Sequence, residues 1–149
     1  MQVQDHQHLS PKQLIEQLRA VAPKAVAGRR KTPGLMRRVK VANPAGGKMT
    51  IGHLMDRVYT RDQWLHRIDI SRAVGREPRL TPDHDGRLIA DAVEEWAKVD
   101  NAPFVLELTG PAGGTFRSGQ GGRQLRLDAV DFCLQVSGRR ESQLAQIVW

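Results

Sequence analysis

Asp62 and His66 are the two residues of this sequence whose types and spacing point most directly to chemistry. They stand four positions apart, and in a helix residues i and i+4 lie on the same face. A carboxylate oxygen and an imidazole nitrogen would then lie side by side, and both are ligands of divalent metals such as zinc. Asp69 continues the same face. The spacing therefore predicts a two-ligand metal site with a second carboxylate close to it.

The helix phase places these polar residues on an apolar stripe. When the helix is counted from Thr50 at about 100° per residue, Asp62 lies within about 20–40° of three apolar residues. These are Ile51, Met55 and Val58. Buried ionisable groups are unfavourable unless they are paired or bind a metal, so we expect an interior site. The alternatives are a hydrogen-bonded cluster of acid, histidine and acid, or a helix rotated so that the three residues meet water.

The elements that carry this site are predicted to be helical up to about residue 99. Ser10 is a typical N-cap, so a first helix begins at Pro11 and runs to about residue 27. Pro23 is expected to kink this helix or to end it a turn early. A basic connector, with a short helical piece near its middle, then leads to helices at residues 50–74 and 82–99.

The C-terminal part alternates short apolar runs with glycine-rich turns, which is typical of strands joined by hairpins. The predicted strands span residues 104–109, 115–117 and 124–127, and Asp128 is the expected N-cap of a last helix. Four large residues are expected in the core of this part: Trp96, Phe104, Phe132 and Leu134. The predicted fold class is therefore α+β.

Length and composition limit the class of protein. The chain has 149 residues, enough for one domain or for two small modules that share a core. No apolar run has the length of a membrane span and the polar start is no signal peptide, so we expect a cytoplasmic protein that does not enter a membrane. Cys133 is the only cysteine, which excludes an intrachain disulfide. Its apolar neighbours favour a buried side chain over a nucleophile.

The net charge of +7 is concentrated between residues 29 and 48. Seven basic residues fall there: Arg29, Arg30, Lys31, Arg37, Arg38, Lys40 and Lys48. Such a cluster can be a nucleic-acid-binding surface, but aromatic residues do not interleave with it. We therefore favour a solvated connector, and a nucleic-acid-associated basic protein is the weaker alternative.

Residues 61–75, which read RDQWLHRIDISRAVG, resemble the mycothiol-dependent maleylpyruvate isomerase family of the DinB-like metal-binding superfamily. The resemblance continues through residues 80–87, 107–114 and 127–139. It implies a DinB-like four-helix bundle followed by a small tail domain similar to sterol-carrier proteins. By this resemblance, residues 1–75 are the second half of the bundle, with the metal-binding helix at 50–74. Residues 76–149 are the α/β tail domain.

The resemblance also implies ligands. The family holds its metal on an early-helix histidine and on an acid and a histidine spaced four apart, which match Asp62 and His66. The family acid is usually glutamate, and the chain corresponds to the C-terminal portion of the family, without the early helix. Its other histidines are no obvious replacement, so the third ligand stays open: His6, His8, His53 and His84. Asp69 is then expected to orient an imidazole, or else to form a salt bridge with Arg67 or Arg72.

The implied chemistry uses a divalent metal, with zinc preferred, and mycothiol or another low-molecular-weight thiol. The metal favours the thiolate, which adds to a conjugated cis double bond and leaves after rotation to the trans isomer. Arg139 matches the position of a functional arginine of the family and is expected to bind a substrate carboxylate. Its alternative role is an interaction with the end of its own helix.

Two further expectations follow. Half a bundle leaves an apolar stripe without an intrachain partner, which predicts a homo-oligomer, most simply a dimer. The competing function is a non-catalytic binding module, in which a hydrophobic groove of the tail domain holds a lipid or a protein partner.

Overall fold

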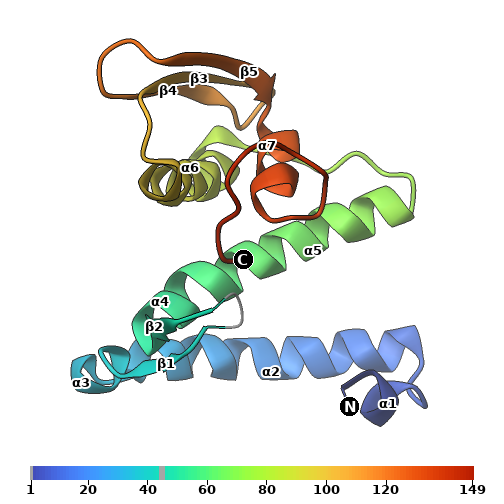
Figure 1. Cartoon of the computed structure of the whole chain (residues 1–149). Coiled ribbons are helices and arrows are strands. Elements are labelled where there is room, and N and C mark those ends of the chain that lie inside the picture. Colours follow the sequence, from blue (N-terminus) through green and yellow to red (C-terminus); the bar gives the residue numbers. More distant parts are fainter. Residues whose placement is uncertain (1, 44–45) are drawn as a thin grey trace. The chain divides into compact units, whose positions relative to one another are not determined.

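The computed structural model describes residues 2–43 and 46–149, and it combines helices with strands, as the sequence predicts. The chain divides into two compact units, of which the first ends at Met55 and the second spans Asp56–Trp149. Figure 1 shows the elements of each unit in the colours of the sequence. Among the helices of the described residues, none combines the length and the apolar character that a membrane span requires.

The first unit is built around one long helix. Its elements are α1 (Gln2–His6), α2 (Pro11–Lys31), α3 (Gly34–Arg37), β1 (Lys40–Ala42), β2 (Lys48–Thr50) and α4 (Ile51–His53). Ser10 caps α2 as predicted, because its side chain accepts a hydrogen bond from the backbone N–H of Gln13 at 3.3 Å. The helix runs through Pro23 to Lys31, so the predicted early end does not occur.

Helix α2 contributes nothing to a core in this structure. None of its residues is buried, and Leu18, on its apolar side, is 68% exposed. The predicted connector contains a short antiparallel pair that the sequence did not indicate, in which β1 and β2 align Val41 with Met49. Among the described residues of this unit, Met49 is the only buried hydrophobic side chain. Such a unit buries too little apolar surface to be stable by itself.

The second unit contains a three-stranded sheet with helices. Its elements are the end of η1 (Leu54–Val58), α5 (Tyr59–Ala73), η2 (Pro82–Gly86), α6 (Arg87–Asp100), β3 (Phe104–Thr109), β4 (Gly114–Ser118), β5 (Arg123–Asp128) and α7 (Ala129–Val136). The strand order is β4-β3-β5, with β3 antiparallel to β4 and parallel to β5. All three predicted strands and the helix capped by Asp128 are confirmed. Strand β3 has the predicted bounds, and β4 and β5 are each one residue longer at both ends.

One hydrophobic core joins these elements. Helices α6 and α7 cover one face of the sheet, and α5 lies against them on the side away from the sheet (Figure 1). The four predicted core residues are all buried: Trp96, Phe104, Phe132 and Leu134. The Trp96 ring lies 4.8 Å from the Phe104 ring and 5.5 Å from the Phe132 ring, centroid to centroid. Ring pairs at these separations stabilise a core beyond their buried area.

Helix α5 belongs to this second core. Trp64, Leu65 and Ile68 are buried in the same cluster as the residues of α6, β3 and α7. The family resemblance predicts residues 1–75 as one helical part, whereas in the structure residues 56–75 belong to the same compact unit as the C-terminal elements. The structure therefore attaches the predicted metal-binding residues to the sheet-containing unit.

Candidate functional site

The polar side of α5 faces outward, which corrects the expected interior position of Asp62, His66 and Asp69. Their side chains are 41%, 60% and 42% exposed. The buried residues of α5 are instead Arg61, Trp64, Leu65 and Ile68. At about 100° per residue, the centre of these four buried residues lies about 90–150° around α5 from Asp62, His66 and Asp69. The helix packs through Trp64, Leu65 and Ile68, so Val58 lies at the edge of the buried side and not at its centre.

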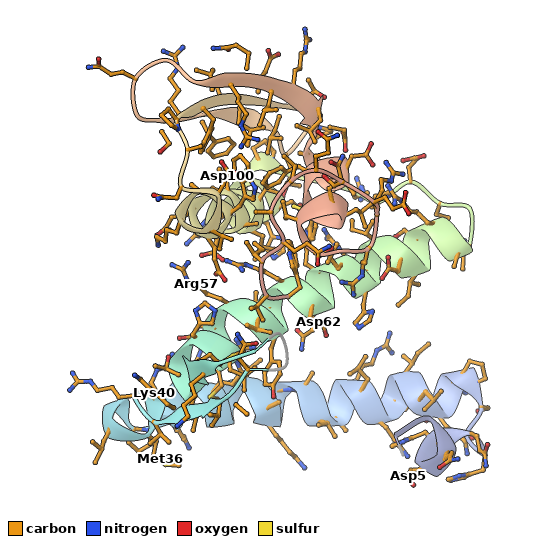
Figure 2. All side chains as sticks on the ribbon, viewed as in Figure 1. Asp5, Met36, Lys40, Arg57, Asp62 and Asp100 are labelled. Atoms are coloured by element: carbon orange, nitrogen blue, oxygen red, sulfur yellow. The ribbon has the colours of Figure 1, made fainter. Side chains whose placement is uncertain are left out.

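The imidazole of His66 lies between two carboxylates. Its Nε2 is 3.5 Å from Asp62 Oδ2, and its Nδ1 is 3.7 Å from Asp69 Oδ2. Both distances exceed a normal hydrogen bond, so the three groups are neighbours without being tightly bonded. Asp62, labelled in Figure 2, lies on the exposed side of α5. This arrangement is the acid, histidine and acid cluster that the sequence offered as an alternative to an interior site.

Arg139 completes the cluster from another element. Helix α7 ends at Val136, and Gly138 adopts a positive φ of 73° that turns the chain toward α5. The Arg139 Nη2 is then 3.7 Å from Asp62 Oδ1, and its Nε is 3.5 Å from Asp69 Oδ2. The structure thus brings together all three residues that the sequence singled out for the site.

The cluster has an excess of negative charge. Two carboxylates face one guanidinium, and the imidazole is neutral unless it is protonated. Asp69 does not pair with Arg67 or Arg72, the partners considered from the sequence, because those arginines pair with Asp85 and Asp131. A cation near the outer side of the cluster would therefore be electrostatically favourable.

The spacing of Asp62 and His66 fits a divalent metal. Zinc bonds to carboxylate oxygen and imidazole nitrogen at about 2.0–2.2 Å, so in tetrahedral geometry two such ligand atoms lie about 3.3–3.5 Å apart. The Asp62 Oδ2 to His66 Nε2 distance is 3.5 Å. Arg139 contacts the other oxygen of Asp62, so it does not occupy the side that faces the imidazole. Asp69 stands at the remaining ring nitrogen, where a carboxylate orients a ligating histidine.

The fit extends to two ligands. Within the described ranges, no group of three histidine, cysteine, aspartate or glutamate side chains is arranged to hold a metal ion. His53, the histidine nearest to the pair in sequence, belongs to α4 of the first unit. A catalytic zinc site uses three protein ligands and an open position, so Asp62 and His66 amount to part of such a site.

The same helix carries a buried arginine that the sequence does not indicate. Arg61 is fully buried, and its Nη2 lies 2.6 Å from Asp91 Oδ2 and 2.9 Å from Glu95 Oε2. Its Nη1 donates to the backbone oxygen of Val148 at 3.3 Å, and its guanidinium carbon lies 5.7 Å from the centre of the Trp149 ring. The acids come from α6 and the last contacts from the C-terminal segment, so no local pattern could have identified this cluster.

Asp85 is a second buried charge that the sequence did not reveal. Its side chain is 2% exposed and accepts hydrogen bonds from Trp64 Nε1 at 2.7 Å, from the Thr81 backbone N–H at 2.6 Å and from Arg67. Burial by itself would raise the pKa of Asp85, but the hydrogen bonds from Thr81, Trp64 and Arg67 outweigh it and lower the pKa to about 2. The sequence does contain one signal for Asp85: an acid in the first turn of a helix that starts after Thr81 is typical of a residue that accepts hydrogen bonds from the helix start.

A cavity of about 720 Å³ opens beside the C-terminal end of α5. Five of its ten lining residues are charged, and the others are glycine, proline or aliphatic residues. The charged ones are Arg72, Arg76, Glu77, Asp128 and Asp131. Asp131 is already paired, at 2.7 Å from Arg140 Nη1. This mixed lining differs from the hydrophobic groove that the lipid-binding alternative expects.

Comparisons of the chain with models of protein families, with curated proteins and with solved structures found no match.

Proposed function

We propose that this protein binds a divalent metal, preferably zinc, through Asp62 and His66, and that it supports thiol-dependent isomerase or transferase chemistry in the cytoplasm. The observation that carries the proposal is the 3.5 Å separation of Asp62 Oδ2 and His66 Nε2 on an accessible helix face. The motif at residues 61–75 supports the same conclusion, since it resembles the mycothiol-dependent maleylpyruvate isomerases and their DinB-like metal site.

Each residue of the cluster has a defined task in this proposal. Asp62 and His66 would hold the metal. Asp69, which lies 3.7 Å from Nδ1 of His66, would accept the Nδ1–H in the metal-bound state and so leave the Nε2 lone pair for the metal. When bound, the metal would favour the thiolate of mycothiol or of another small thiol over the neutral thiol. Cys133 is buried and burial raises the pKa of its thiol, so the nucleophilic thiol comes from outside the protein.

Arg139 is the group that would bind a substrate carboxylate. Its side chain is 28% exposed and already lies beside two carboxylates of α5 at 3.5–3.7 Å. A guanidinium has donors on both edges, so it can keep one contact to α5 and offer its other edge to a ligand. The substrate would then lie next to the thiolate that adds to its double bond.

Self-association is part of the proposal. The apolar side of α2 is exposed, and a second copy of the chain would bury it and provide the helices that a bundle needs. If two copies placed their Asp62 and His66 pairs opposite each other, four ligands would close the metal site. Such a site would be structural and would leave no position for a thiol.

Zinc titration of the purified chain by calorimetry tests the metal site. His66→Ala and Asp62→Ala should each abolish binding, because each removes one of two ligands. His53→Ala is the matched control, since it removes a histidine of α4 and should leave the affinity unchanged. An equal loss in His53→Ala and His66→Ala, or no zinc binding by the unmodified chain, would refute the proposed site.

A further inference from the structure

We propose that Asp85 is a positioning residue for the Asp62 and His66 pair. By holding Trp64 and Arg67, it fixes the rotation of α5 about its own axis, and it thereby keeps the cluster facing Arg139. The proposal depends on the proposed function only in the identity of the ligand, which is a divalent metal held by Asp62 and His66.

The two oxygens of Asp85 serve two different elements. Oδ1 accepts hydrogen bonds from Trp64 Nε1 at 2.7 Å and from Arg67 Nη2, both on α5. Oδ2 accepts from the backbone N–H of Thr81 at 2.6 Å and from its hydroxyl at 3.2 Å. The carboxylate is therefore a bridge between α5 and the segment that starts η2. Because only 2% of its side chain is exposed, water does not compete for these bonds.

The bridge is placed to resist rotation. At about 100° per residue, Trp64 and Arg67 lie about 60° apart on α5, and their midpoint is about 150° around the helix from that of Asp62 and His66. A single hydrogen bond would let the helix turn around one contact. Two donors held by one oxygen at different angles stop the rotation in both directions.

Helix α6 provides a second restraint, which acts on Arg61 of α5. It lies about 90° around the helix from the midpoint of Trp64 and Arg67, and it is held by Asp91 at 2.6 Å. Because η2 holds α5 on one side and α6 holds it on another, the helix keeps a single rotational position about its own axis. A rotation of about 20° would displace side chains at the helix surface by about 2 Å. The contacts of Arg139 to α5, already 3.5 and 3.7 Å long, would then be lost.

A carboxylate is the group that this bridge requires. Its hydrogen bonds all come from donors: Trp64 Nε1, Arg67 Nη2, and the N–H and hydroxyl of Thr81. His84 Nδ1 lies further off, at 3.5 Å from Oδ1. The amide of an asparagine has one acceptor oxygen, and its NH₂ group would face donors on one of the two sides. Asp85→Asn should therefore keep the shape of the site while losing the hold on either α5 or Thr81.

The test compares Asp85→Asn with Asp100→Asn. Asp100 also belongs to the second unit and loses an ion pair, to Arg123 at 2.6 Å, but that pair does not involve α5. Two quantities are measured on folded protein: the ¹⁵N shifts of the His66 imidazole, which report its tautomer and surroundings without metal, and the affinity for zinc. We expect Asp85→Asn to change the His66 shifts and to weaken zinc binding about 10-fold or more, whereas Asp100→Asn changes neither. Asp85→Glu should restore part of the zinc affinity.

The two readouts separate the two proposals. If the unmodified chain does not bind zinc, the proposed function fails, and the His66 shifts still decide the role of Asp85. If Asp85→Asn is folded and keeps both the wild-type shifts and the wild-type affinity, Asp85 has no positioning role. Should Asp85→Asn not fold, Arg67→Met removes one of the two contacts from a partly exposed side chain. The same changes are expected in Arg67→Met, and their absence there would overturn the proposal.

Discussion

The buried guanidinium of Arg61 meets the Asp91 carboxylate through two nitrogens, with Nε at 2.8 Å and Nη2 at 2.6 Å from the same oxygen. The partners are not equivalent, because Arg61 is fully buried while 26% of the Asp91 side chain is exposed. Asp91 also lies 3.0 Å from Arg57, which is labelled in Figure 2. Removing one member of this pair therefore has a different consequence from removing the other.

Asp91→Ala should destabilise the second unit more than Arg61→Met does. The first change leaves a buried cation with Glu95 as its remaining acid, and breaking a buried pair costs about 3–5 kcal/mol. The second change leaves an acid that reaches water and keeps Arg57. Urea unfolding of both variants at neutral pH measures the difference. Equal losses of unfolding free energy, or a larger loss in Arg61→Met, would show that the burial of Arg61 does not determine the stability of this ion pair.

Asp85 predicts a specific acid sensitivity. Its pKa falls from the ordinary value of 3.8 to about 2 on folding. A pKa that is lower in the folded state means that the contribution to stability is complete above about pH 4. It is lost as the pH falls through about 2, and it amounts to about 2 kcal/mol. The stability gap between wild type and Asp85→Asn should therefore shrink between pH 4 and pH 2. A gap that stays constant over this range would contradict the assignment.

Phe132→Ala should cost about 3–5 kcal/mol of unfolding free energy. The ring is fully buried and lies edge-on to Trp96 at 5.5 Å, so its removal leaves a cavity and breaks a ring pair. Chemical denaturation followed by tryptophan fluorescence measures the loss. Val99→Ala is a suitable control on a half-exposed side chain and should cost little. A loss below about 1 kcal/mol for Phe132→Ala would mean that the core is packed differently.

Leu18 provides a test of self-association. The side chain is 68% exposed on α2, and a dimer that buries this helix would place it in the interface. We expect the chain to sediment as a dimer at micromolar concentration and Leu18→Glu to sediment as a monomer. Gln17→Glu adds the same charge next to it on the helix, off the apolar stripe, and should leave the dimer intact. A well-folded monomer for the unmodified chain would exclude this role of α2.

Local sequence patterns predicted most of the elements of the fold. Ser10, Thr50 and Asp128 cap their helices through side-chain hydrogen bonds to backbone N–H groups, and all three are of the residue types that favour this position. The strands followed from alternating apolar residues between glycine-rich turns. Caps and turns depend on neighbours within a few residues, which is why the sequence alone is sufficient for them.

The features that the sequence did not predict depend on distant residues. The parallel pairing of β3 with β5 joins strands separated by β4, and strand order is decided by packing rather than by the strands themselves. Arg61 is buried because Asp91 and Glu95 of α6 accompany it. Asp62 and His66 face outward because α5 packs into the shared core through its other side, which carries Trp64, Leu65 and Ile68.

The sequence predicted which residues come together at the candidate site but not that they face water, and their role in binding a metal stays a prediction. Asp62, His66 and Arg139 do come together, as the spacing and the resemblance led us to expect. The difference concerns burial, because the stripe of Ile51, Met55 and Val58 does not continue as the buried side of α5, which is centred on Arg61, Leu65 and Ile68. A periodic pattern can assign residues to one face of a helix, but only the packing of that helix determines whether the face meets water.

The fully enclosed position of Cys133 in α7 has a practical consequence for following the dynamics of the second unit. A thiol that is buried and held protonated reacts with alkylating reagents only in molecules whose core has opened. Since the sequence contains a single cysteine, every labelled molecule records one opening event at a known position. The labelling rate under native conditions therefore reports how often α7 separates from the sheet, without a denaturant and without any engineered probe.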